Sequence, residues 1–332
     1  MEEFSLIERY FHWPIKFNQN QITKSVGDDC AIISPKKNQK LLITTDCLVQ
    51  NVHFPNNTPA DLIAIKSLAV NLSDIAAMGG KPAWYTLVLG LPQAINETWI
   101  ETFSKALLEQ SLKYQVDLVG GDTVKSEQLF ITIQMHGYSQ NKIMQRDKAK
   151  VGDIIAVTGQ LGGAALGLKF ALDSDEFSSI SFTKNEINEA LNALSQPIPQ
   201  IELGEKISHY SDCALDISDG LLADLGHITS ASNCGAEINI ERIPLADCLL
   251  KLPKEQAVKL ALTGGDDYQL CFTISKKNWQ KMMKNDELSK VCSKIGQIVS
   301  SEGIQLLKEA NPINQLPDLN IMHLKPGYNH FN

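Results

Sequence analysis

The sequence lacks any long apolar stretch. No run within its 332 residues approaches the ~18 apolar residues that cross a bilayer. The first residues, Met-Glu-Glu-Phe-Ser-Leu-Ile-Glu, contain neither the basic segment nor the long apolar segment of a secretory signal. We therefore expect a cytoplasmic protein with no membrane contact.

Closely spaced cysteines and an excess of basic residues are also missing. None of the seven cysteines belongs to a C-x-x-C pair, so we expect buried free thiols rather than a zinc site. The chain carries 30 basic against 38 acidic residues, a net charge of −8, whereas proteins that bind a nucleic-acid backbone cluster Lys and Arg. Small molecules are therefore the expected partners, and nucleic acids are not.

The common nucleotide-binding and hydrolase motifs do not occur. The chain contains no G-x-x-x-x-G-K-[ST], no H-R-D or D-F-G, no strict G-x-G-x-x-G, no G-x-S-x-G and no H-E-x-x-H. These absences exclude a standard P-loop NTPase and a protein kinase. One glycine-rich segment, 159–167, follows a predicted strand and opens a predicted helix, where it either admits an anion or lets the helix pack tightly on a sheet.

The chain does contain a regular alternation of strand-like and helix-like segments, which is typical of an α/β protein. Its length and its 43% hydrophobic content allow two globular domains. A polar stretch over 138–152 interrupts the alternation, and we place the domain boundary there, between residues 1–140 and 150–332. The predicted strands include 30–34, 41–45, 84–89, 129–137, 153–158, 213–217 and 268–274, and the predicted helices include 58–78, 97–114 and 221–232.

Aspartates recur beside glycines or just outside predicted strand ends. Each one alone is typical of an ordinary turn. Ligands of open α/β sheets, however, gather beyond the carboxyl ends of the strands, where these segments can converge. The segments are Gly27-Asp28-Asp29, Thr44-Thr45-Asp46, Asn71-Leu72-Ser73-Asp74, Gly120-Gly121-Asp122, Asp216-Ile217-Ser218-Asp219-Gly220 and Gly264-Gly265-Asp266-Asp267.

Asp74 lies inside a predicted helix, 58–78, that should be largely buried. It shares one narrow stripe with Ser67, Asn71 and Met78, and apolar residues cover most of the remaining circumference. A buried carboxylate needs a partner. That partner is either a Lys or Arg side chain or a divalent cation.

Asp216 and Asp219 pose a similar choice, because capping of the following helix accounts for only one of the two acids. Carboxylates that meet at ~5 Å repel each other by about 3 kcal/mol at an effective dielectric constant of ~20, so a cluster of them requires cations. Oxygen ligands without His or Cys favour Mg²⁺, which completes its shell with water and phosphate. The acids therefore predict phosphate chemistry with bound Mg²⁺.

Longer motifs occur in a fixed order along the chain. They are Phe4-Ser-Leu-Ile, Gly27-Asp-Asp-Cys-Ala, Thr45-Asp46, His53-Phe54, Leu68-Ala-Val-Asn-Leu-Ser-Asp-Ile-Ala-Ala-Met-Gly79, Gly120-Gly-Asp-Thr, Asp216-Ile-Ser-Asp-Gly220, Gly264-Gly-Asp-Asp-Tyr-Gln-Leu and Gly327-Tyr-Asn-His-Phe331. Together they resemble the thiamine-monophosphate kinase family over essentially the whole chain. The resemblance implies the aminoimidazole-ribonucleotide-synthetase fold, in which an N-terminal α/β domain dimerises through a shared β-barrel and a C-terminal α/β domain packs beside it.

This resemblance also implies an activity and the residues that serve it. The activity is ATP-dependent phosphorylation of thiamine monophosphate to thiamine diphosphate in a homodimer, by direct in-line transfer assisted by several Mg²⁺ ions and without a nucleophilic residue. By position in the motifs, the metals are held by Asp29, Thr44, Thr45, Asp46, Asp74, Asp122, Asp216 and Asp219; ATP is contacted by Gly121, Asp122, Arg146 and Ser218; and thiamine phosphate is contacted by His53, Asp266 and Tyr328.

Some positions leave alternatives open. Asp266 stands where the family usually has Glu, so its carboxylate is one methylene shorter. His53 is alternatively a surface-loop residue, and Tyr328 alternatively anchors the C-terminus.

Two other functions compete with the kinase. One is another enzyme of the same superfamily, which acts on a purine intermediate, on selenide or in hydrogenase maturation. No cysteine precedes Cys30, which opposes selenide chemistry, and the last residues, Asn329-His-Phe-Asn332, lack the cysteine of the hydrogenase role. The second is a non-catalytic sensor of nucleotide or thiamine phosphate, which would keep the acids and bind without turnover.

Overall fold

The computed structural model describes residues 3–27, 30–139, 142–308 and 311–312. The chain divides into two compact units: unit 1 comprises residues 1–75 and 80–140, and unit 2 comprises residues 76–79 and 141–332. The predicted site residues Asp29 and Tyr328 lie outside the described part of the chain. No helix within the described part is long and apolar enough to cross a bilayer.

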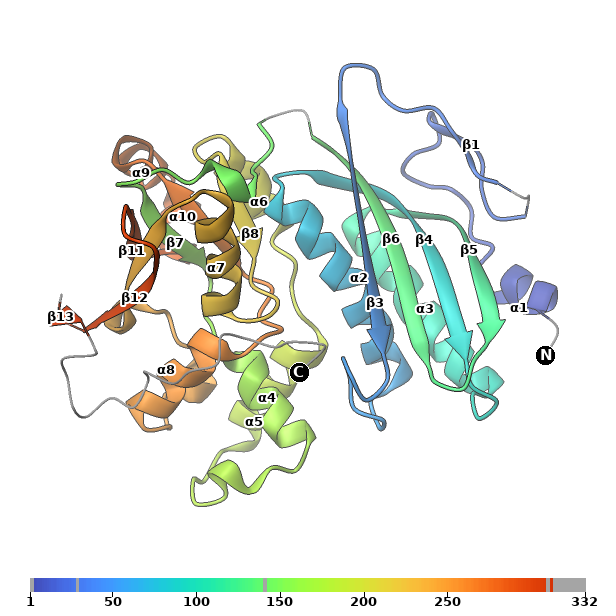
Figure 1. Ribbon diagram of the computed structural model, residues 1–332. Coiled ribbons are helices and arrows are strands. Elements are labelled where there is room, and N and C mark those ends of the chain that lie inside the picture. The colour runs from blue at the N-terminus through green and yellow to red at the C-terminus, as the bar shows by residue number, and fades with distance from the viewer. Residues whose placement is uncertain (1–2, 28–29, 140–141, 309–310, 313–332) are drawn as a thin grey trace. The chain divides into compact units, whose positions relative to one another are not determined.

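Unit 1 is built on a four-stranded sheet. Its elements are α1 (Glu3–Tyr10), β1 (Ile22–Lys24), β2 (Ile32–Ile33), β3 (Lys40–Val49), α2 (Ala60–Ala77), β4 (Lys81–Leu91), α3 (Glu97–Tyr114), β5 (Asp117–Lys125) and β6 (Phe130–Ser139). The strand order is β3-β6-β4-β5, in which only β4 and β5 run parallel. Helices α2 and α3 cover one face of the sheet (Figure 1). We call the opposite face the outer face.

The outer face of unit 1 is covered at one end only. Ile22 of β1 and Ile33 of β2 pack there against Trp84 and Tyr138, in a small apolar cluster. Farther along the edge strand β3, the side chain of Ile43 is 58% exposed. The outer face therefore keeps apolar surface in contact with solvent.

Unit 2 is built on a seven-stranded sheet among the described residues, in the order β13-β12-β9-β11-β7-β10-β8. Its strands are β7 (Ile154–Thr158), β8 (Cys213–Asp216), β9 (Gly235–Asn239), β10 (Leu270–Ile274), β11 (Cys292–Val299), β12 (Gly303–Lys308) and β13 (Asn311–Pro312). Its helices are α4 (Gly163–Ala171), α5 (Lys184–Ser195), α6 (Ile201–Ser208), α7 (Leu221–Ala231), α8 (Lys254–Thr263), α9 (Lys276–Met282) and α10 (Asp286–Val291), with short 3-10 turns η1 (Arg146–Lys148), η2 (Asp175–Phe177), η3 (Ile240–Arg242) and η4 (Asp247–Leu249).

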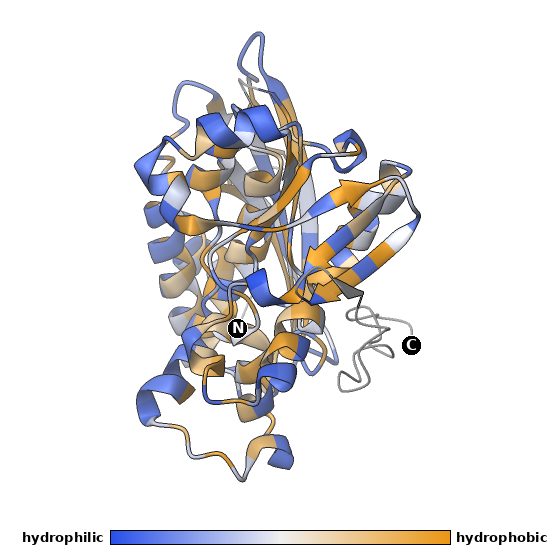
Figure 2. Ribbon diagram, turned by 90° about the vertical axis from the view of Figure 1, so that its left-hand side faces the viewer, coloured by the Kyte–Doolittle hydropathy of each residue, from blue (hydrophilic) through white to orange (hydrophobic). Residues whose placement is uncertain are grey.

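Both faces of the unit 2 sheet are buried by helices. Val157 and Leu215 pack with apolar residues of α7 and α8, whereas Ala156 and Phe272 pack with residues of α6, α9 and α10. Figure 2, coloured by hydropathy, shows apolar residues along the strands and hydrophilic residues in loops and on outer helix turns. All pairings in this sheet are antiparallel except β9 with β12. The predicted alternation of strands and helices is therefore present, and the sheet combines parallel and antiparallel pairings. The sequence did not reveal the strand directions, because a strand buried on both faces is a continuous apolar run whichever way it points.

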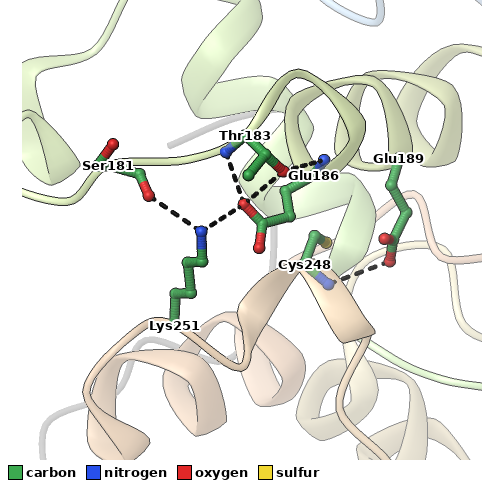
Figure 3. A network of polar contacts seen from close by, with 6 residues as sticks. All are labelled: Ser181, Thr183, Glu186, Glu189, Cys248 and Lys251. Carbon is green, nitrogen blue, oxygen red and sulfur yellow. Dashed lines mark hydrogen bonds and ion pairs between the residues drawn. The ribbon is translucent and has the colours of Figure 1, made fainter.

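A capping box starts helix α5 and ties it to a neighbouring loop. The Thr183 hydroxyl accepts the Glu186 N–H, and the Glu186 carboxylate accepts the Thr183 N–H at 2.6 Å. Lys251 donates to the same carboxylate at 2.8 Å, as Figure 3 shows. The Lys251 ammonium and the Thr183 N–H together lower the pKa of Glu186 to about 2. This network fixes the start of the helix from outside as well as from within.

Two predictions about local structure are wrong. Asp46 lies inside strand β3 rather than beyond its end, and the strand β5 that contains Asp122 was not predicted. Two glycines conceal β5, because glycine is depleted in strands. At Gly121 an added Cβ would lie 1.8 Å from the carbonyl oxygen of Leu87, so only glycine permits the pairing with β4. Five of the seven cysteines are buried as expected, but Cys30 and Cys47 are exposed.

Candidate functional site

Unit 1 gathers four oxygen-bearing side chains between β3 and α2. The Thr44 hydroxyl donates to the Asp74 carboxylate, and the Asp46 N–H donates to the Asn71 amide oxygen at 3.1 Å. The polar stripe predicted on helix 58–78 therefore faces β3. A threonine hydroxyl, which was neither of the two predicted kinds of partner, is one partner of Asp74. We call Thr44, Asp46, Asn71 and Asp74 the unit 1 oxygen cluster.

Asp122 and Thr45 do not join this cluster within one chain. Through the strand pairings, Asp122 lies level with Val88, then with Thr132 and then with Cys47, so it shares the outer face with Cys47. Asp46, the neighbour of Cys47, faces α2 instead. Since β3 and β5 are opposite edges of the sheet, three strand spacings of about 4.8 Å also separate them.

The ring and the backbone carbonyl of His53 each accept a hydrogen bond. Its Nδ1 accepts the Val49 N–H at 3.0 Å, and its carbonyl oxygen accepts a hydrogen bond from Lys66 Nζ at 3.2 Å. With Nδ1 as acceptor, a neutral ring carries its proton on Nε2. The His53 side chain is half-buried, and Lys66 is only 3% exposed. Lys66 was not among the predicted residues, although a lysine within an otherwise apolar helix was the signal for it.

Unit 2 brings three loops to one edge of its sheet. Strand β10 lies between β7 and β8 and runs antiparallel to both. The ends of β7 and β8 and the start of β10 therefore meet at the same edge. The loops there are 159–163, 217–220 and 264–269, and we call them the loop edge.

Backbone hydrogen bonds join two of these loops directly. The Asp266 N–H donates to the Ser218 carbonyl at 2.8 Å, and the Tyr268 N–H donates to the Ile217 carbonyl at 2.8 Å. The approach requires glycine at 265, where an added Cβ would lie 2.4 Å from the Ser218 oxygen. The structure thereby brings together four predicted site residues: Asp216, Ser218, Asp219 and Asp266.

The acids of the loop edge differ in burial. Asp216 is 4% exposed, whereas Asp219 and Asp266 are half-buried. Asp266 has a backbone φ of +68° and accepts a hydrogen bond from the Tyr268 hydroxyl at 3.1 Å. Two half-buried carboxylates thus lie on loops whose backbones are bonded to each other.

Asp224 is a site residue that the sequence prediction missed. Its Oδ2 accepts the N–H groups of Ser218, Asp219 and Gly220 at 3.0, 3.0 and 3.1 Å. Burial and, to a lesser extent, the charge of Asp219 raise the pKa of Asp224 to about 7, against the lowering effect of the three N–H donors. An acid in the first turn of the helix after Asp-Ile-Ser-Asp-Gly was the available signal.

Asp267 occupies the N-terminus of α4. Its carboxylate accepts the Gly162 N–H at 2.7 Å, and burial raises its pKa to about 7. A carboxylate of the chain itself therefore occupies the start of α4, within the glycine-rich segment 159–167. At Gly167 an added Cβ would lie 2.0 Å from the Ala190 oxygen of α5. The structure supports tight packing for this segment, but against helix α5 rather than against a sheet as predicted.

Arg146 lies at the far end of β8 from Asp216. Its carbonyl oxygen accepts hydrogen bonds from Ser232 Oγ at 2.9 Å and from Cys213 Sγ at 3.7 Å. Cys213 begins β8, and Asp216 ends it. The side chain of Arg146 is exposed, so its backbone is anchored while its guanidinium faces solvent.

The donor chemistry of both units fits Mg²⁺. Proteins bind this ion through oxygen, usually with one or two carboxylates, and leave other positions to water and substrate phosphate. The unit 1 oxygen cluster and the loop edge present carboxylates, hydroxyls and an amide oxygen. Within the described residues, no group of three or more His, Cys, Asp or Glu side chains is placed to hold a metal ion.

Two family models match separate parts of the chain. Residues 27–139 match the family model "AIR synthase related protein, N-terminal domain", and residues 150–308 match "AIR synthase related protein, C-terminal domain". The thiamine-monophosphate kinase of Haemophilus influenzae is 40% identical over 344 residues, which cover 100% of this chain and 98% of that protein.

Two solved structures are similar over nearly the whole chain. The thiamine-monophosphate kinase of Stenotrophomonas maltophilia K279a superposes with a TM-score of 0.82 at 35% identity, covering 94% of this chain and 98% of that one. A ThiL protein complexed with AMPPCP and TMP superposes with a TM-score of 0.76 at 27% identity, covering 99% and 96%. The chain therefore belongs to the AIR synthase related proteins and, within them, to the thiamine-monophosphate kinase family.

Proposed function

We propose that the protein transfers the γ-phosphoryl group of ATP to the phosphate of thiamine monophosphate, which yields thiamine diphosphate and ADP. The observation that carries this proposal is the 40% identity to a thiamine-monophosphate kinase over the full length of both chains. The similar structure that holds an ATP analogue together with TMP supports both substrates.

The reaction joins two anions, so charge compensation and positioning are its main requirements. We propose direct in-line transfer without a phosphorylated residue. Mg²⁺, when bound, supplies positive charge that offsets repulsion between the two phosphates. The residues proposed to hold it are Asp29, Thr44, Thr45, Asp46, Asp74 and Asp122 of unit 1, and Asp216 and Asp219 of unit 2.

Further residues are proposed to bind the two substrates. Those for ATP are Gly121, Asp122, Arg146 and Ser218, and those for thiamine phosphate are His53, Asp266 and Tyr328. The support within the described residues is positional: Ser218 and Asp266 belong to loops that are hydrogen-bonded to each other, and the His53 ring has a fixed orientation. The exposed guanidinium of Arg146 is suited to phosphate, which it can bind with two parallel hydrogen bonds.

We also propose a homodimer that forms through the outer face of unit 1, with the two sheets closing into a shared barrel. Leu41, Ile43 and Val124 leave 40%, 58% and 40% of their surface exposed on or beside this face. Apolar patches of this kind mark interaction surfaces.

The test is direct. Purified protein is incubated with ATP, Mg²⁺ and thiamine monophosphate, and thiamine diphosphate and ADP are quantified by chromatography. We expect equal amounts of both products and no turnover when EDTA replaces Mg²⁺. Unphosphorylated thiamine is the control acceptor and should yield nothing, because it offers a hydroxyl in place of a phosphate.

Two results would contradict the proposed kinase activity. A folded protein that binds ATP and thiamine monophosphate but forms no diphosphate would refute the kinase and favour the sensor. Turnover of ATP with a purine intermediate, and none with thiamine monophosphate, would favour another enzyme of the superfamily.

A further inference from the structure

The loop 217–220 receives unusual support from Asp224. This residue lies in the first turn of α7, and its side chain is almost fully buried, with 4% exposed. One oxygen, Oδ2, accepts three consecutive backbone N–H groups, those of Ser218, Asp219 and Gly220. A single carboxylate therefore fixes the orientation of three successive peptide planes.

These hydrogen bonds are costly to lose. A buried N–H group without an acceptor destabilises the folded state, and a hydrogen bond to a charged acceptor is stronger than one to a neutral acceptor. Gly220 has a backbone φ of +115°, a conformation that other residues rarely adopt, so the loop also depends on a specific turn. Without Asp224, several N–H groups would need new partners, and the loop would change its shape.

The other side of the same loop is held by the loop before β10. The Ile217 and Ser218 carbonyl oxygens accept the N–H groups of Tyr268 and Asp266, both at 2.8 Å. The N–H groups of Ser218, Asp219 and Gly220 thus point to Asp224, whereas the Ile217 N–H and two carbonyls of the loop are bonded to 264–269. The backbone is clamped from both directions, which presents the oxygens of Ser218 and Asp219 in one arrangement before any ligand binds.

Unit 1 contains the same device at a loop without predicted site residues. The Asp117 carboxylate, also 4% exposed, accepts the backbone N–H groups of Lys16, Phe17 and Asn18 at 2.8, 3.2 and 2.9 Å. The two aspartates match in burial and in the number of backbone N–H donors, and Asp117 also accepts the Asn18 side-chain amide at 2.9 Å. They differ in whether the supported loop carries residues proposed to bind a ligand.

We infer that Asp224 is a positioning residue for nucleotide binding: its carboxylate holds the backbone of 217–220 so that Ser218 and Asp219 meet Mg²⁺-nucleotide in a preset geometry. The inference rests on the proposed function for the identity of the ligand. It extends that function by giving a role to a residue that touches neither ATP nor metal.

The experiment compares Asp224→Ala, Asp224→Asn and Asp117→Ala with the full-length wild-type protein. Binding of AMPPCP with Mg²⁺ is measured by calorimetry, without thiamine monophosphate, and KM for ATP and kcat are then measured in the coupled reaction. We expect Asp224→Ala to raise the Kd for AMPPCP and the KM for ATP about tenfold or more, the equivalent of one lost charged hydrogen bond. Asp224→Asn keeps an oxygen acceptor and should stay within about threefold of wild type.

Asp117→Ala is the matched control. It removes an equally buried carboxylate with as many backbone N–H donors and one side-chain donor more, so we expect at least a comparable loss in the free energy of unfolding, with the Kd for AMPPCP within about twofold of wild type. Should Asp224→Ala not fold, Asp224→Ser takes its place. The inference then requires weaker AMPPCP binding by Asp224→Ser than by Asp224→Asn.

Four outcomes overturn the inference. The first is wild-type affinity for AMPPCP in a folded Asp224→Ala protein, and the second is a loss of affinity in Asp117→Ala as large as that in Asp224→Ala. The third is equal loss of affinity in Asp224→Ala and Asp224→Asn. The fourth is a wild-type protein that binds no AMPPCP. Failure of the kinase assay alone is a different result, because it refutes the proposed reaction while the nucleotide-binding comparison still decides the role of Asp224.

Discussion

The carboxylate of Asp267 accepts a hydrogen bond from the backbone N–H of Gly162 at 2.7 Å, and this contact ties the loop before β10 to the start of α4. A helix N-terminus carries partial positive charge and attracts anions. Here the anion is an aspartate that burial makes harder to ionise. The pair therefore links the pH of the solution to the stability of the loop edge.

We predict that Asp267→Asn changes the pH dependence of stability. Burial raises the pKa of Asp267 from 3.8 to about 7, so between these values the folded state holds a proton that the unfolded state has released. This group therefore costs the wild type stability as pH rises from 4 to 7, and the loss is complete above 7. The amide has no such proton, so the free energy of unfolding of the variant relative to wild type should increase from pH 4 to pH 8.

Denaturant unfolding at several pH values measures this difference. Asp173→Asn, at an exposed position, is the control and should leave the pH profile unchanged. A constant difference between Asp267→Asn and wild type across this range would contradict the prediction.

Asp46→Asn should reduce activity far more than stability. The side chain faces α2 in the unit 1 oxygen cluster, and its own N–H bond to Asn71 survives the change. If the carboxylate holds Mg²⁺, turnover should fall by about 100-fold, partly restored by excess Mg²⁺. The melting temperature measured in EDTA should change little.

Cys47→Ser is the neighbouring control, since Cys47 faces the outer side of the same strand and is exposed. Its turnover should stay close to that of wild type. If Asp46→Asn unfolds in EDTA, the carboxylate has a structural role and the metal assignment at this position is wrong.

Ile43→Asp should convert a dimer into monomers. Ile43 is 58% exposed on the outer face, and a charge placed in an apolar interface loses solvation without gaining a partner. Sedimentation or light scattering at a series of protein concentrations measures the mass. Val151→Asp, at a residue of unit 2 that is 62% exposed, should keep the wild-type mass. A monomeric wild type, or a variant that stays dimeric, would refute the proposed interface.

Thr183→Ala should destabilise the protein by about 0.5–2 kcal/mol, because it removes the cap of helix α5. Equilibrium unfolding in denaturant gives the value. Thr102→Ala is the control. The exposed Thr102 hydroxyl donates to the Thr98 carbonyl within helix α3, so the change should be neutral or slightly stabilising. Equal destabilisation by both variants would show that the capping box contributes nothing particular.

Local patterns predicted the elements whose boundaries depend on nearby residues. The helix predicted over 97–114 has those bounds in the structure, where the Asn96 side chain accepts the Trp99 N–H at 2.9 Å and Gln115 ends it with a φ of +57°. The polar stripe of α2 was also predictable from its periodicity. Strand β5 was not, because glycine is depleted in strands and the need for Gly121 arises only from its close approach to Leu87 of β4.

The predicted site was divided by features that no local pattern contains. Asp122 is separated from Asp46 by the strand order and by the register of β5, which shifts beside Tyr85. A change of one residue in register moves a side chain to the other face of a sheet. Asp224 and Asp267 were missed because their roles depend on backbone N–H groups, whose directions are set by the folded loops.

The two α/β units, the thiamine-monophosphate kinase family and the few short segments that contain the candidate aspartates could all be predicted from the sequence. Periodicity, turn residues and motif order are local properties, so they can be read along the chain. Only the tertiary structure decided which aspartates meet. Ser218 and Asp266 are neighbours because β10 pairs antiparallel with β8. Strand pairing of this kind arises from hydrogen bonds between segments that are distant in the sequence, and their order and register are established only when the sheet forms.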